Sequence, residues 1–201
     1  MLSTSSAPLL ESIPPLPRRL RLTRGDCAVL EQSGQFEKKK AELIEGDLIE
    51  KMGKKRPHSE SWEAIARWLF GVFSIVNSET SIDVAPEDNP TSEPEPDLIV
   101  LKHRVRDANP KPEDLLLVVE ISDSTLRFDL TVKAGLYARA GILDYWVLDV
   151  AGHRIGVHRD PQSGVYQSVR WYGEGENVSP LAAPDARLAV ADAFPGEGGL
   201  A

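Results

Sequence analysis

Two acidic residues stand at the ends of apolar runs, where an unpaired charge is costly. Glu120 lies near the end of LLLVVEIS (residues 115–122), and Asp97 begins DLIVL (residues 97–101). Burying a carboxylate without a partner costs several kcal/mol. Each acid therefore needs a basic partner, a metal ion or access to solvent.

The connection between the two runs predicts that these carboxylates meet. Residues 102–114 carry no helical pattern, so the runs are most simply adjacent antiparallel strands. Asp97 and Glu120 then lie side by side at one end of a sheet. Adjacent carboxylates repel each other, and a divalent cation such as Mg²⁺ relieves the repulsion. The pair favours a metal site; the alternative is that Asp97 faces solvent while Glu120 pairs with a nearby base.

Two further residues bear on this chemistry. Ser122 follows Glu120 by two positions and shares its strand face. A metal-dependent nuclease is expected to carry a lysine there, to help activate the attacking water. Lys133, one turn into the following helix, is the candidate replacement. From its spacing alone, an ordinary exposed helix lysine is the simpler interpretation.

Turn signals and periodicity predict the elements that position these residues. Residues 41–52 alternate around Glu45-Gly46, which predicts two short strands joined by a tight turn. After Pro57, apolar residues recur at spacings of three and four and predict an amphipathic helix.

The second half of the chain predicts a helix and several strands. In residues 128–141, Asp129 fits a helix N-cap and Gly141 a helix end. Strands are predicted at residues 80–86, 144–150, 153–159 and 164–172, the last two as a hairpin joined by DPQSG (160–164).

This order of elements predicts one α/β (α+β) domain over residues 21–194, built around one sheet. Residues 1–20 are rich in Ser, Pro and Leu and predict a flexible arm, and residues 195–201 predict a disordered tail. No internal repeat is evident.

The composition limits the cellular setting. The single cysteine, Cys27, excludes an internal disulfide framework. No apolar run approaches the roughly 20 residues that cross a bilayer, and the N-terminus lacks the pattern of a secretion signal. We therefore expect a cytoplasmic protein that does not bind a membrane.

The charges are unevenly distributed. The net charge of −8 argues against a strongly basic nucleic-acid coat protein. Basic residues nevertheless cluster in residues 51–58 and 101–112. Between Arg67 and Lys102, every charged residue is an acid. Charge runs are usually solvated faces, so this distribution alone does not assign a partner.

Taken together, these motifs resemble the Uma-two family of restriction endonucleases, within the PD-(D/E)xK nuclease superfamily. The resemblance spans residues 40–172. It is carried by the hairpin at 41–52, the helix PHSESWEAIARWL with His58, the Pro96-Asp97 pair, the strand with Glu120 and Ser122, the helix with Asp129 and Lys133, and YARAGILDYWVLD (137–149).

The resemblance implies a fold and a metal site. The fold would be restriction-endonuclease-like, a mixed central sheet flanked by helices with an extra antiparallel hairpin. Asp97 and Glu120 would bind Mg²⁺ or Mn²⁺ together with the Ile121 carbonyl. Lys133 would be the catalytic lysine, relocated from the strand to the helix.

Other residues would support that site. Ser122 and Asp129 match the family motif beside the metal ligands, and His58 matches a recurrent histidine. For His58 we expect a hydrogen bond that fixes the start of its helix rather than direct catalysis.

The reaction implied is hydrolysis of DNA phosphodiester bonds. The metal would bind a phosphate oxygen and activate a water, while Lys133 assists that water or neutralises the transition state. A homodimer is expected, since cutting two strands requires two sites. Basic side chains would contact the DNA backbone: Lys51, Lys54, Lys55, Arg56, Lys102, Arg104 and Arg106.

A non-enzymatic alternative stays open. Serine at the strand position and the acidic balance also fit a nucleic-acid-binding or protein-interaction module with a silent metal site. The two functions differ in whether Asp97→Ala or Glu120→Ala removes an activity from a folded protein.

Overall fold

A computed structural model describes residues 19–34, 40–51, 53 and 55–194. Nearly all of the predicted arm (1–20), the predicted tail (195–201) and Lys54 lie outside the described residues.

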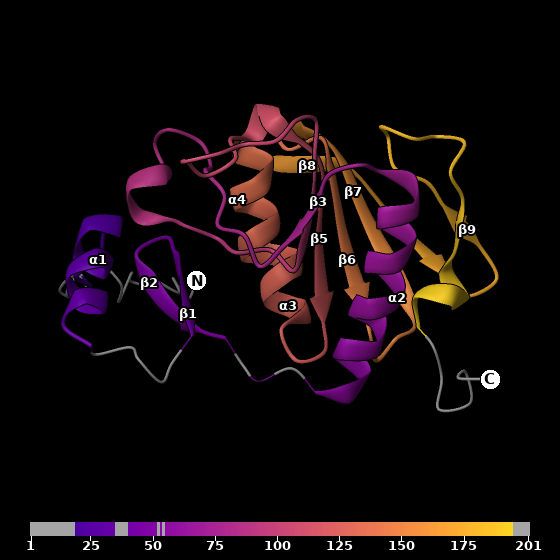
Figure 1. Cartoon of the computed structure of the whole chain (residues 1–201), viewed down its shortest axis with the longest axis horizontal. Coiled ribbons are helices and arrows are strands. Elements are labelled where there is room, and N and C mark those ends of the chain that lie inside the picture. The colour runs from indigo at the N-terminus through magenta and orange to yellow at the C-terminus, as the bar shows by residue number, and fades with distance from the viewer. Residues whose placement is uncertain (1–18, 35–39, 52, 54, 195–201) are drawn as a thin grey trace, which may run out of the picture.

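A six-stranded mixed sheet forms the centre of the molecule, in the order β3-β4-β5-β6-β7-β8 (Figure 1). β5 and β6 are parallel, and the other neighbours are antiparallel. This sheet confirms the predicted fold class. Its strands are β3 Val76–Ser78, β4 Leu98–Leu101, β5 Leu115–Ser122, β6 Asp144–Asp149, β7 Arg154–Gln162 and β8 Val165–Gly173.

A helical crossover joins the two parallel strands, as parallel pairing requires. It consists of α3 Leu126–Phe128, the π-helical turn η3 Asp129–Lys133 and α4 Ala134–Arg139. Gly141 has a φ of 75°, which confirms it as the helix end.

The prediction that Asp129 is the N-cap of this helix is wrong. Thr125 precedes the first helical residue, and Asp129 lies inside the crossover. The Asp129 carboxylate accepts hydrogen bonds from the buried Ser122 hydroxyl and from the Thr125 hydroxyl, which a pattern of helix signals does not reveal.

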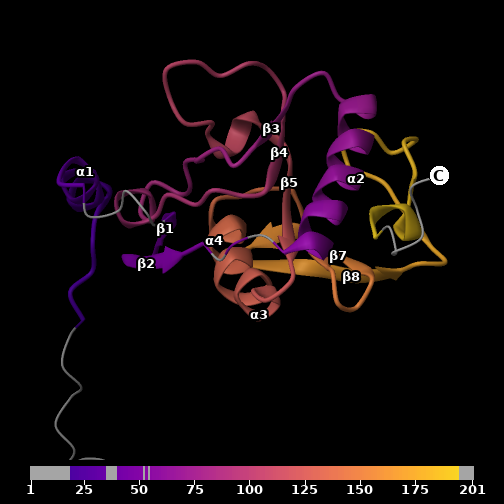
Figure 2. The ribbon, with the colours of Figure 1, turned by 60° about the horizontal axis from the view of Figure 1, so that its bottom comes forward.

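The two faces of the sheet carry separate apolar cores. Leu117, Val119 and Ile121 of β5 pack in the core beneath α2 Arg56–Val72, which is completed by η4 Val190–Ala193. Val118 packs in the core beneath the helical crossover. Figures 1 and 2 show α2 and the crossover on opposite sides of the sheet. By strand alternation, Glu120 therefore faces the crossover.

The predicted extra hairpin is confirmed as a separate sheet. β1 Ala41–Ile44 pairs antiparallel with β2 Asp47–Glu50. The turn residues Glu45 and Gly46 have φ angles of 49° and 80°, as a type I′ turn requires. An isolated antiparallel β-bridge between Leu43 and Glu93 connects the hairpin to the rest of the molecule.

Two predictions about strands are corrected. Residues 80–86 form no strand, because separate hydrogen bonds to Pro94 and Pro110 hold this segment instead of a ladder. The β7–β8 hairpin turns at Ser163-Gly164, so Pro161 lies within β7. The structure also contains two short antiparallel strands that the sequence did not predict, β9 Asn177–Val178 and β10 Leu188–Ala189.

The remaining helical elements are short. They are α1 Arg24–Gln32, η1 Asn89–Thr91 and η2 Pro112–Asp114. Within the described residues, no helix is both long and apolar enough to cross a membrane.

Candidate active site

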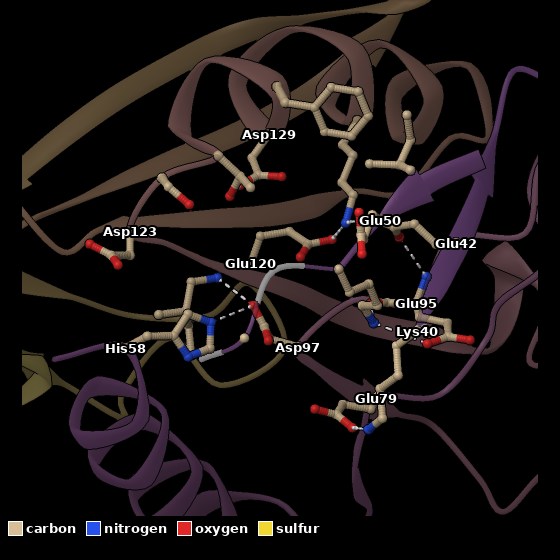
Figure 3. A pocket seen from close by; sticks show the side chains of 18 of the residues that line it. Lys40, Glu42, Glu50, His58, Glu79, Glu95, Asp97, Glu120, Asp123 and Asp129 are labelled. Atoms are coloured by element: carbon tan, nitrogen blue, oxygen red, sulfur yellow. Dashed lines mark hydrogen bonds and ion pairs between the residues drawn. The ribbon is translucent and has the colours of Figure 1, made fainter. Parts of the chain in front are cut away.

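A cavity of 480 Å³ opens where β4 begins and β5 ends, between the hairpin, the start of α2 and the helical crossover (Figure 3). Its described lining is rich in charge. It contains the lysines Lys40, Lys51, Lys55 and Lys133, and the acids Glu42, Glu50, Glu79, Glu95, Asp97, Glu120, Asp123 and Asp129.

Asp97 and Glu120 meet in this cavity. β4 and β5 are antiparallel with Leu98 opposite Val119, which confirms the predicted strand pairing and sets Asp97 opposite Glu120. Asp97 Oδ2 accepts a hydrogen bond of 2.9 Å from the Ile121 backbone N–H. The two acidic side chains therefore occupy one end of the sheet, on the face covered by the crossover (Figure 3).

Glu120 is a buried carboxylate held through one oxygen. Its Oε1 lies 2.9 Å from Lys133 Nζ and accepts a hydrogen bond of 2.9 Å from the Tyr137 hydroxyl. Burial raises the pKa of Glu120 above its ordinary value, Lys133 opposes this rise, and Asp129 and Asp97 add to it. An additional cation beside this carboxylate would therefore be stabilising.

Lys133 is the cationic centre of the cluster. Its Nζ lies 2.9 Å from Glu120 Oε1 and 2.9 Å from Glu42 Oε1, and its side chain is only 5% exposed. The simpler interpretation of Lys133 as an exposed helix lysine is thus wrong. Burial alone would lower the pKa of Lys133, but Glu120 and Glu42 raise it above its ordinary value. The two carboxylates therefore favour the ammonium form of Lys133.

Ser122 and Asp129 form a second buried contact beside this cluster. Asp129 Oδ2 accepts hydrogen bonds from Ser122 Oγ at 2.7 Å and from Thr125 Oγ1 at 2.6 Å. The Tyr145 hydroxyl donates to the Asp129 carbonyl at 3.0 Å. These bonds hold the π-helical turn that carries Lys133, and such turns are frequent at functional sites.

His58 contacts Asp97 and not the first turn of its own helix. Its Nε2 lies 3.5 Å from Asp97 Oδ2, and its buried Nδ1 has no hydrogen-bond partner among the described residues. This contact links the first turn of α2 to the start of β4, and the expectation that it fixes the start of the helix stays a prediction. Its place beside Asp97 reflects the packing of α2 over the end of β4.

The predicted DNA-binding cations fall into separate places. Lys51 and Lys55 line the cavity, where Lys51 Nζ lies 3.0 Å from Glu95 and Lys55 Nζ lies 3.4 Å from Asp123. Arg56 pairs with Glu60 on the surface of α2.

The other three cations lie outside the cavity. Lys102, Arg104 and Arg106 follow the opposite end of β4 from Asp97. Five residues of extended chain place Lys102 roughly 16 Å from Asp97. The structure does not bring this group together with the carboxylate pair.

Two buried residues of the site were not predicted. Glu42 shares a strand face with the core residue Ile44, so an acid on an apolar face was its signal. Tyr137 carries no such signal, because an aromatic residue on a helix usually belongs to the core. Only the packing of α4 on β5 brings its hydroxyl to Glu120.

The oxygen atoms of Asp97 and Glu120 suit a small cation that keeps most of its water, because they are too few to surround a metal ion completely. Among the described residues, no group of three or more His, Cys, Asp or Glu side chains is arranged to hold a metal ion. Two carboxylates and a backbone carbonyl are a sufficient protein contribution for Mg²⁺, which keeps several waters.

Two comparisons with known proteins bear on the family and the fold of this chain. The Uma2 family model, described as "Putative restriction endonuclease", matches residues 28–191 and confirms the resemblance. A crystal structure of "a putative nuclease belonging to DUF820" from Anabaena variabilis is 18% identical with a TM-score of 0.62, covering 77% of this chain and 89% of that chain. This likeness shows the fold. No curated protein matches the sequence significantly.

Proposed function

The chain belongs to the Uma2 family of restriction-endonuclease-like nucleases, and we propose that it is a metal-dependent endonuclease that hydrolyses DNA phosphodiester bonds. The observation that carries this proposal is the adjacency of Asp97 and Glu120 on one sheet face, with a buried lysine ammonium against Glu120. Two acids and a cation are the groups that this hydrolysis requires.

The proposed metal ligands are Asp97, Glu120 and the Ile121 carbonyl. Both hydrogen bonds of Glu120 among the described residues use Oε1, which leaves Oε2 for a cation. In an extended strand, the N–H and C=O of one residue point to the same side. Since the Ile121 N–H bonds Asp97, its carbonyl also points toward this carboxylate.

Mg²⁺ or Mn²⁺ bound there would polarise a phosphate oxygen and make a bound water acidic. The protein's own part is to hold charge in place. Lys133, as an ammonium ion, stabilises negative charge that develops on the phosphate and donates hydrogen bonds that orient the water. It does not act as a general base, because Glu42 and Glu120 hold its proton. Asp129 and Ser122 support the turn that presents Lys133.

We further propose that the backbone of DNA is contacted by the predicted cations, with Lys51 and Lys55 nearest the reacting phosphate. A cytoplasmic homodimer with two such sites would cut both strands. The acidic residues that line the cavity repel the phosphates of DNA. The surface that contacts DNA is therefore limited to the positions of the basic residues.

The second candidate function is a binding module on the same fold. The observation that favours it is Ser122, which occupies the strand position expected for lysine. Its hydroxyl donates a hydrogen bond to Asp129. In that case the site binds metal weakly or not at all, and nucleic acid or protein binding does not depend on Glu120.

Metal binding and strand nicking together test the proposed function. We expect the wild type to bind Mn²⁺ and Mg²⁺ in calorimetry and to nick supercoiled plasmid, and Asp97→Asn and Glu120→Gln to lose both. Asp114→Asn, at the other end of β5, is the control and should keep both. If the folded wild type binds no metal at millimolar concentration, the binding module becomes the better account.

The proposed DNA contacts can be tested separately by the dependence of DNA binding on salt concentration. Replacing Lys55 by alanine should weaken DNA binding and reduce the slope of log K against log salt by about 0.9, one phosphate contact. The Lys55 side chain is 70% exposed, so its ion pair with Asp123 is well hydrated on the lysine side and stability should hardly change. Filter binding at several salt concentrations measures the slope. Arg187→Ala, an exposed cation between β9 and β10, should leave it unchanged.

A further inference from the structure

The β1–β2 hairpin contributes a buried carboxylate to the cavity. Glu42 has only 6% of its side chain exposed, and its Oε1 lies 2.9 Å from Lys133 Nζ. Burying this acid on a strand face that otherwise packs in a core is costly unless the contact with Lys133 compensates. The hairpin is thus joined to the site by one buried ion pair.

The second oxygen of this carboxylate is also engaged. Glu42 Oε2 accepts a hydrogen bond of 3.1 Å from the backbone N–H of Glu95. Glu95 lies two residues before Asp97 in the chain. Glu42 therefore links the lysine to the segment that leads into the proposed metal ligand, and its orientation is held at both oxygens (Figure 3).

The charges in this contact are unequal in number. One ammonium ion lies at the same distance, 2.9 Å, from Glu42 and from Glu120. Without the negative charge of Glu42, the ammonium would be committed to Glu120 alone and would compete with a cation for that carboxylate. The negative charge of Glu42 offsets part of the positive charge of the ammonium ion, so a second cation beside Glu120 meets less repulsion.

We infer that Glu42 is a positioning residue, which shares the Lys133 ammonium with Glu120 so that Lys133 stays fixed while Glu120 remains able to bind a cation. This inference rests on the proposed function for its purpose, and on the two measured contacts for its geometry. Glu42 is not proposed as a metal ligand, because no three acidic, histidine or cysteine side chains among the described residues are grouped for one.

The first test needs neither metal nor DNA. In ¹⁵N-lysine-labelled protein, the Lys133 ammonium should give an NH₃⁺ signal protected from exchange with water, identified by its loss in Lys133→Met. Glu42→Gln should broaden or remove this signal, and Glu42→Asp should restore part of it. Glu45→Gln is the matched control, since it removes the hairpin's ion pair with Arg139 and leaves Lys133 untouched. A signal equally protected in Glu42→Gln would overturn the inference.

The second test uses Mn²⁺ as the probe in calorimetry on the same full-length variants. Glu42→Gln should bind Mn²⁺ about tenfold more weakly than the wild type, or about 1.4 kcal/mol. Glu45→Gln should bind it normally. Complete loss, equal to that in Glu120→Gln, would make Glu42 a ligand and contradict the inference, and so would unchanged affinity.

Plasmid nicking separates this inference from the proposed function. If the wild type nicks, Glu42→Gln should lower kcat about tenfold and leave the KM for DNA within about twofold. If the wild type does not nick, the proposed function fails, while the ammonium signal still decides whether Glu42 positions Lys133. An equal loss of kcat in Glu42→Gln and Glu45→Gln would contradict the inference. It would show that Glu42 only holds the hairpin in place.

Discussion

Replacing Lys133 by methionine is expected to slow plasmid nicking by about 10²–10³-fold and to destabilise the protein by about 3–5 kcal/mol. Methionine keeps the volume of the side chain but removes the charge that lies between Glu42 and Glu120. Two buried carboxylates then face each other without a cation. Nicking below the unfolding transition and urea unfolding measure the two effects separately.

Two comparisons identify the cause of this loss. Lys133→Met/Glu42→Gln should recover part of the lost stability, because one of the two uncompensated charges is gone. Mn²⁺ should still bind Lys133→Met at least as tightly as the wild type, since a competing cation has been removed. Arg187→Met, an exposed cation that does not line the cavity, is the control for loss of a positive charge. Full nicking activity in folded Lys133→Met would reject the proposed role.

Replacing Asp144 by alanine is expected to cost about 3–5 kcal/mol of stability, although Asp144 lies outside the candidate active site. Its buried carboxylate accepts hydrogen bonds from Arg159 Nε at 2.9 Å, Trp146 Nε1 at 2.9 Å and the Leu181 backbone N–H at 2.8 Å. Burial raises the pKa of Asp144, while Arg159 opposes the rise. Alanine leaves three buried or half-buried donors without their acceptor. Urea unfolding followed by tryptophan fluorescence measures the change.

Asp149, at the other end of β6, is the matched control. Its carboxylate pairs with Arg154, whose side chain is 46% exposed and can return to water. Asp149→Ala should therefore cost about 1–2 kcal/mol. Equal costs for the two variants would show that burial of the partner does not govern the penalty. Metal binding should survive in both.

The Lys133 contact explains how a strand without the expected lysine can keep the same charge. Ser122 holds Asp129, and the π-helical turn that Asp129 belongs to carries Lys133 to Glu120. The ammonium thus reaches the carboxylate from the helical crossover rather than from the strand. This arrangement requires the crossover to pack tightly on β5, and the buried tyrosine hydroxyls at Glu120 and Asp129 contribute to that packing.

The sequence by itself determined the strands β4 and β5 and the adjacency of the two acids. A long apolar run ends in Glu120, a shorter run begins with Asp97, and a connection without a helix leaves antiparallel pairing as the simplest arrangement. The Glu45-Gly46 turn was predictable for a similar reason, because positive φ angles restrict the residues that can occupy it. These are local constraints, and local sequence carries them.

The tertiary structure alone decided the charge state and partners of the site. Lys133 could equally have faced solvent, and its burial depends on how the crossover packs against β5 and the hairpin. Glu42 lies 91 residues before Lys133 in the chain, and no local pattern relates them. A buried charge is stable only when the fold places an opposite charge beside it. Which residue lies beside it depends on how the whole chain packs and not on the sequence of any one segment.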